Sequence, residues 1–117
     1  MERKEVKHES HRFRIYKHVE PVGIEGEYNV KLRIENIGEI KLKNLIIIDI
    51  VPSSSSITEF TSSKAVTHEI VRVFDKSELF IKMSELNSSS SVVINYNLNG
   101  SSEYPKTSPT VNILDKD

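Results

Sequence analysis

The sequence predicts an all-β protein that folds as a single antiparallel β-sandwich of seven to eight short strands. Valine and isoleucine account for 25 of the 117 residues, whereas alanine occurs once. β-Branched side chains pack well on a pleated sheet and lose rotamer freedom in a helix. Apolar residues recur at every second position, with turn residues at intervals of roughly 8–12 residues, as is typical of sandwiches. No segment shows the period of about 3.6 residues expected of an amphipathic helix.

Residues 27–35 and 92–98 show the clearest strand pattern. In the first segment, apolar side chains from Tyr28 to Ile34 occupy every second position, with charged or amide side chains between them. This alternation is typical of an antiparallel strand with one buried and one wet face. The other strands are predicted, in chain order, at residues 12–19, 45–51, 57–61, 66–74, 79–83 and 110–114. A short alternating piece at 40–43 has outward lysines that suit an edge position.

Three residues are expected to have structural roles where strands end. Asn36 and Gly38 flank Ile37 directly after a predicted strand. Residues that tolerate a positive φ are favoured in such a turn. Pro52 follows the apolar run 45–51 and is expected to close it, because proline cannot donate a hydrogen bond to a ladder.

Asp49 lies inside this apolar run and shares the parity of Leu45, Ile47 and Val51. If that face is the core, its carboxylate needs hydrogen-bond donors. We expect Asp49 to lie at the end of the core face and to accept backbone N–H bonds from a neighbouring loop. A calcium-binding or catalytic carboxylate is the alternative. Calcium takes about six to eight oxygen ligands, and the surrounding sequence has no dense Asp/Asn cluster.

The chain is predicted to contain one domain, at residues 12–114, between two solvated ends. Residues 1–11 alternate in charge and have Val6 as their one aliphatic side chain after the initial methionine. A segment with so little apolar surface to bury is predicted to be a flexible arm, and it has no signal-peptide pattern. Residues 115–117 are predicted to be a solvated tail.

Composition excludes several classes of function. A formal net charge of −1 argues against a nucleic-acid partner, and the absence of cysteine excludes disulfides, thiolate zinc sites and cysteine nucleophiles. The longest apolar stretch, 45–51, is far shorter than the ~18–20 residues of a membrane span. We therefore expect no transmembrane segment and no nucleic-acid partner.

No catalytic, cofactor-binding or metal-binding residue is predicted. Many of the 16 serines lie in polar runs, and a nucleophilic serine needs a base and an orienting acid within reach. His8 and His11 lie three positions apart but have no third candidate ligand nearby, whereas zinc takes about four. The chain is therefore not expected to be an enzyme.

The residues Ile46, Ile48 and Ile50 are the candidate interface. They alternate with the predicted core residues of the same strand, so both faces of this strand are apolar. A large contiguous apolar patch is rarely left exposed on a monomer. Two interpretations stay open: a loop or the N-terminal arm covers this face, or a partner does. The partner would be a second copy, an adjacent domain or a ligand protein.

The segment from Tyr28 to Gly38, followed by Asn44 to Pro52, resembles a family signature. It is similar to the immunoglobulin-like (Ig-like) conserved-repeat domains of bacterial and archaeal surface proteins, which are related to the CARDB cell-adhesion domain. The resemblance spans roughly residues 12–114. The chain departs from the family at residues 87–91, an asparagine and four serines where a turn containing glycine is usual.

This resemblance implies an Ig-like sandwich and a non-catalytic structural or adhesion module. Such a module would belong to a larger prokaryotic, specifically archaeal, cell-surface protein and act through protein–protein contacts. The alternative is an intracellular appendage-type Ig-like domain that binds a partner protein or peptide on a sheet edge or face. The location would be the cell surface if the chain is part of a longer exported protein, and otherwise the cytoplasm. Glycosylation sequons at Asn87 and Asn99 fit the first location.

Overall fold

A computed structural model describes residues 4–9, 12–23, 26–52, 55–74, 76–99 and 109–113. These ranges contain strands and no helix. The strands are β1 (Lys4–Glu9), β2 (Phe13–Pro21), β3 (Glu27–Asn36), β4 (Leu42–Pro52), β5 (Ser56–Ser62), β6 (Thr67–Val73), β7 (Lys76–Leu86), β8 (Ser91–Asn99) and β9 (Thr110–Ile113).

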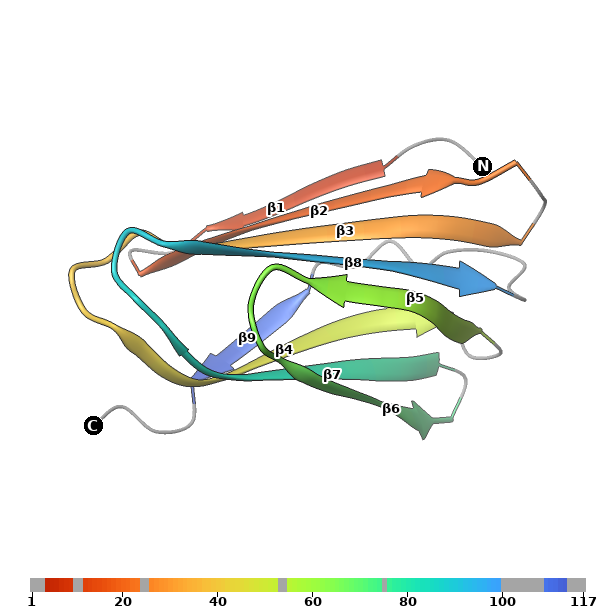
Figure 1. Cartoon of the computed structure of the whole chain (residues 1–117). Helices are drawn as coiled ribbons and strands as arrows, with labels where there is room; N and C mark the ends of the chain where they lie inside the picture. Colours follow the sequence, from red (N-terminus) through yellow and green to blue (C-terminus); the bar gives the residue numbers. More distant parts are fainter. Residues whose placement is uncertain are drawn as a thin grey trace.

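The strands form two sheets that pack as two layers (Figure 1). One sheet has five strands in the order β1-β2-β3-β8-β5, and the other has four in the order β6-β7-β4-β9. All neighbouring strands are antiparallel. The predicted all-β antiparallel sandwich is therefore confirmed. The described residues form nine strands, one or two more than expected.

The additional strand is β1, which lies within the segment predicted to be a flexible arm. Residues Lys4–Glu9 pair with β2 in a continuous register from Lys4↔Val19 to Glu9↔Arg14. That part of the prediction is wrong. An edge strand is held by main-chain hydrogen bonds to its neighbour, and charged side chains are common on edges. The alternating charges of this segment therefore do not prevent pairing.

The short alternating piece at 40–43 and the apolar run 45–51 were expected to be separate, whereas the structure joins residues 42–52 into β4. Asn44 has a positive φ of 51°, and Lys43 and Asn44 are both exposed between the buried Leu42 and Leu45. The positive φ shifts the alternation by one residue. Both ends of β4 can therefore face the core, and Pro52 closes the strand as predicted.

The core lies between the sheets and is built from alternate residues of their central strands. The segments 27–35 and 92–98 turn their apolar faces inward as expected, with Leu32 opposite Ile94. The buried hydrophobic residues are Ile15, Val19, Tyr28, Val30, Leu32, Ile34, Leu42, Leu45, Ile47, Val51, Leu79, Ile81, Met83, Leu86, Val92, Ile94, Tyr96 and Leu98.

Asn36 connects two loops at one end of the sandwich. Its buried side chain donates Nδ2–H bonds to the carbonyls of Ile40 (3.0 Å) and Leu86 (2.9 Å), and its Oδ1 accepts from the Gly38 N–H (3.0 Å). Neither Asn36 nor Gly38 has a positive φ. The prediction that these two residues provide a positive φ is therefore wrong. Asn36 stabilises the turn through hydrogen bonds.

The serine-rich turn before β8 contains a strained residue. Ser89 has a φ of 61°, a conformation that glycine adopts at lower cost. Its N–H donates to the Asn36 carbonyl at 3.0 Å. The Ser89 backbone therefore takes the left-handed conformation that a glycine would more easily provide, and the turn is tied to the end of β3.

A β-bulge in β5 turns an aromatic side chain toward the core. The register with β8 shifts between Thr58 and Thr61, and Glu59 within this interval has a φ of 52°. The next residue, Phe60, packs partly buried against the core and stacks with Tyr96 at a centroid distance of 6.1 Å. The bulge therefore redirects Phe60 onto the inward-facing ring of Tyr96.

Candidate interaction surface

The outer face of the five-stranded sheet is polar. Asn29 donates hydrogen bonds to the side-chain carbonyls of Asn95 and Asn97, each at 2.8 Å. On the same face Arg33 pairs with Glu35 at 2.9 Å. The asparagine side chains pair across β3 and β8, whereas Arg33 and Glu35 pair along β3. This face has the wet, charged surface expected of a sandwich exposed to solvent.

The outer face of the four-stranded sheet is apolar along its centre. Ile46, Ile48 and Ile50 alternate with buried residues of β4 and are themselves half-buried. Ile48 lies directly opposite Phe80 of β7, which also points outward and is half-buried. On β6 the outward Val71 is 40% exposed. We call these five residues the isoleucine face. It combines the three predicted interface residues with Phe80 and Val71, which were not predicted.

Charged side chains of both signs lie beside and within the isoleucine face, with Glu78 directly between Ile50 and Val71. Lys76, Glu78 and Lys82 lie at outward positions of β7, and Lys82 is 3.5 Å from Glu69 of β6. Phe74, in the turn between β6 and β7, is fully exposed. Two bases and two acids therefore accompany the isoleucine face, and the aromatic side chain of Phe74 lies in solvent at one end of the same sheet.

The described part of the N-terminal segment does not cover the isoleucine face. β1 pairs with β2 at the edge of the five-stranded sheet, whereas Ile46, Ile48 and Ile50 belong to β4 in the other sheet. Within the chain, the segment expected to cover this face was a loop or the N-terminal arm. Residues 4–9 of the arm do not cover it. The prediction that a partner covers this face remains open.

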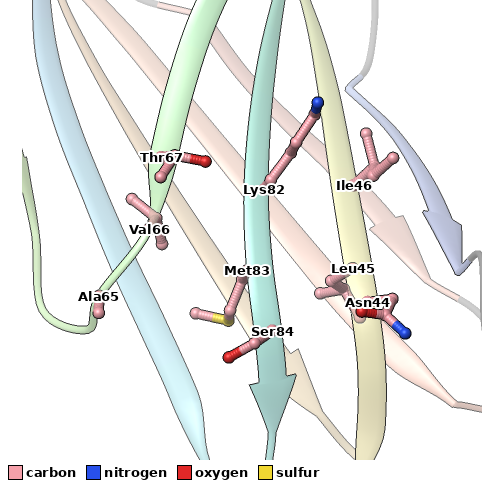
Figure 2. A pocket seen from close by; sticks show the side chains of 9 residues that line it. All are labelled: Asn44, Leu45, Ile46, Ala65, Val66, Thr67, Lys82, Met83 and Ser84. Atoms are coloured by element: carbon pink, nitrogen blue, oxygen red, sulfur yellow. The ribbon is translucent and has the colours of Figure 1, made fainter.

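An open groove of about 450 Å³ lies where β6 separates from β7. The β6–β7 ladder ends at Thr67↔Lys82, whereas β7 continues to Leu86. Figure 2 shows Ala65, Val66 and Thr67 on one side of the groove and Lys82, Met83 and Ser84 on β7. Beyond Lys82, no described strand pairs with this side of β7. The groove therefore borders an accessible strand edge.

Asp49 occupies a different environment from the one expected. Its side chain is fully buried near the middle of the core rather than at its end. Oδ1 accepts a hydrogen bond from Lys17 Nζ at 2.5 Å, and Oδ2 accepts one from the Tyr96 hydroxyl. The donors are therefore side chains from β2 and β8, and the expected loop N–H groups are not its described partners. Lys17 was not predicted to be a core residue.

The described residues contain no candidate metal site. Among the residues whose positions are described, no three His, Cys, Asp or Glu side chains form a group that could hold a metal ion. His11 and the His8 side chain lie outside the described part of the structure. His68 stacks on Phe60 at 3.8 Å. Within the same described ranges, no helix is long and apolar enough to cross a membrane.

Comparison with known proteins supports the architecture. Neither the protein-family models nor the curated proteins include a match to this sequence. Among solved structures, the chain is similar to the yeast delta-COP-I mu-homology domain, with a TM-score of 0.50 and 16% sequence identity. The match covers 79% of this chain and 35% of the other. The likeness concerns the β-sandwich fold.

Proposed function

We propose that the chain is a non-catalytic Ig-like structural or adhesion module of a larger prokaryotic cell-surface protein. It acts by protein–protein contact through the isoleucine face. The proposal rests on the difference between the two outer faces. Polar side chains on the outer face of one sheet hydrogen-bond to one another, whereas the other sheet presents Ile48 and Phe80 at its centre. The placement in a surface protein rests on the resemblance of residues 28–52 to conserved-repeat domains.

The partner that fits this face best is a second domain of the same kind. Two copies related by a two-fold axis would each contribute the same apolar strip. Two positive and two negative side chains lie beside or within this face (Lys76, Lys82, Glu69 and Glu78), so each copy offers charges complementary to those of the other. Packing the two strips together would remove the half-exposed isoleucines from water.

We expect Ile48→Lys to abolish self-association while the monomer stays folded. A lysine at the centre of the face would bring two like charges together in a symmetric contact. Sedimentation equilibrium over a range of protein concentrations measures the mass. The wild-type chain should form a reversible dimer, and the variant should remain a monomer with an unchanged β-sheet circular dichroism spectrum.

Val93→Lys provides the matched control. Val93 is a half-buried, outward-facing aliphatic residue of a central strand, but it lies on the polar face of the other sheet. This variant should dimerise like the wild type. A monomeric wild-type chain at all concentrations would contradict the proposal, as would equal masses for all three proteins. Unfolding of Ile48→Lys would show that the face belongs to the core.

The groove beside β7 favours a second candidate function, the binding of an extended peptide. A strand edge with free main-chain groups can accept an added strand, and the neighbouring apolar side chains can select its residues. The edge after Lys82 is open on one side among the described strands, and Ala65 and Val66 lie next to it. This is the sheet-edge mode of the appendage-type alternative.

We expect Ala65→Trp to block such peptides. Ala65 is exposed at the groove, so the indole would fill the groove without disturbing the core. Peptides selected from a random displayed library should bind the wild type and Ala65→Ser equally. They should lose at least about tenfold in affinity for Ala65→Trp, or roughly 1.4 kcal/mol. Selected peptides that bind Ala65→Trp as tightly would exclude the groove as their site.

A further inference from the structure

A lysine, an aspartate and a tyrosine meet in the dry interior between the two sheets. Lys17 is 2% exposed, and Asp49 and Tyr96 are 0% exposed. Lys17 and Tyr96 come from β2 and β8 of the five-stranded sheet, and Asp49 comes from β4 of the opposite sheet (Figure 1). Lys17 and Asp49 are the only buried residues with charged side chains in the described part of the chain. Their contact therefore connects the two layers.

The surroundings of this cluster exclude water. Asp49 lies between the buried Ile47 and Val51 on the inward face of β4. Lys17 lies between the buried Ile15 and Val19 on β2. Apolar side chains therefore enclose the point where Lys17 Nζ meets the Asp49 carboxylate. The nitrogen and the carboxyl group that would react are already in hydrogen-bond contact.

We propose that Lys17 and Asp49 condense to form an intramolecular amide cross-link. In this reaction a proton first passes from Nζ to Oδ1. The Nζ lone pair then attacks Cγ of Asp49 and forms the new N–C bond. The Cγ–Oδ1 bond then breaks, and Oδ1 leaves as one water molecule with the transferred proton and a second proton from Nζ. No oxidant or other reactant is consumed. The fold fixes the two groups, and well-oriented groups reach effective concentrations of about 10⁵–10⁸ M.

Tyr96 is positioned to assist the reaction. Its hydroxyl donates a hydrogen bond to Oδ2, the oxygen that gains negative charge when Nζ attacks the carbonyl carbon. A donor aimed at a developing oxyanion is especially effective where water is excluded. Phe60 stacks against the Tyr96 ring at 6.1 Å and helps to hold it in place. Tyr96 is therefore proposed as a catalytic residue for this self-modification.

The cross-link would join β2 covalently to β4 of the other layer. A pulling force applied near the N-terminus would then pass between the sheets through a covalent bond rather than through hydrogen bonds alone. This inference does not depend on the isoleucine face, because the reacting groups are buried and lie on the inward sides of their strands.

The intact mass of the folded, full-length chain tests the proposal. After denaturation, the wild-type protein should weigh one water molecule less than its sequence requires. Trypsin does not cleave after a lysine whose amine is blocked. A branched peptide joining residues 15–31 to residues 44–64 is therefore expected in the digest, with Lys17 linked to Asp49.

Two variants identify the reacting groups. Lys17→Arg keeps the positive charge but has no primary amine, so its full sequence mass is expected. Tyr96→Phe should slow the loss of water by about 10²-fold, the effect of removing one oxyanion donor. A folded wild-type chain that keeps its full mass after long incubation would overturn the proposal. So would a loss of water that persists in Lys17→Arg or that yields no branched peptide.

Discussion

Replacing Asp49 with alanine is expected to lower the free energy of unfolding by at least about 3 kcal/mol. The substitution leaves the Lys17 amine and the Tyr96 hydroxyl in the core without the carboxylate that accepts from both. Removing one partner of a buried ion pair is costly because the other charge has already lost its water. Urea unfolding followed by circular dichroism measures the loss. A change of less than about 1 kcal/mol would contradict this account.

The double variant Lys17→Met, Asp49→Leu separates the ionic contact from the proposed amide. Apolar residues of similar size often replace a buried ion pair without loss of stability. If the contact is ionic only, the double variant should be about as stable as the wild type. If the amide forms, the wild type also gains from a closed loop between positions 32 residues apart. The double variant should then lie about 4 kcal/mol below it.

Much of the sandwich could be predicted because the alternation of apolar and polar residues along a strand shows directly which side chains are buried. Residues 27–35 and 92–98 face the core as their pattern indicates. β1 could not be predicted in this way, because main-chain pairing to an edge leaves no apolar pattern in the side chains. The joining of 40–43 and 45–51 was also missed, since it depends on a single positive φ at Asn44.

The buried cluster was missed because each charge was interpreted alone. Lys17 has the same parity as Ile15 and Val19, and Asp49 has the same parity as Ile47 and Val51. Considered together, two opposite charges at core positions of different strands are compatible with a buried ion pair. Alternation does not say which strands face one another across the two layers, so the sequence pattern alone did not bring these residues together. The role of Asn36 was missed for a similar reason, since its Leu86 partner is distant in sequence.

Asn36→Ala is expected to lower the free energy of unfolding by about 2–3 kcal/mol. The side chain makes three hydrogen bonds to main-chain groups, and two of them lead to carbonyls of different segments, at Ile40 and Leu86. Alanine would leave these groups without the Asn36 partner. Because the bonds join the β3–β4 turn to the end of β7, we expect faster amide hydrogen exchange in both loops, measured by NMR.

Two further variants show whether hydrogen bonding or turn geometry matters at this site. Gly38→Ala should change stability by less than about 0.5 kcal/mol. Its new Cβ would lie 3.5 Å from Asn36 Oδ1, an ordinary contact, and Gly38 does not have a positive φ. Asn36→Asp keeps the acceptor for the Gly38 N–H but replaces the amide donor with an oxygen facing two carbonyls. This variant should therefore lower the free energy of unfolding at least as much as Asn36→Ala does. If instead Gly38→Ala is the more damaging change, backbone conformation rather than the Asn36 side chain stabilises this end of the sandwich.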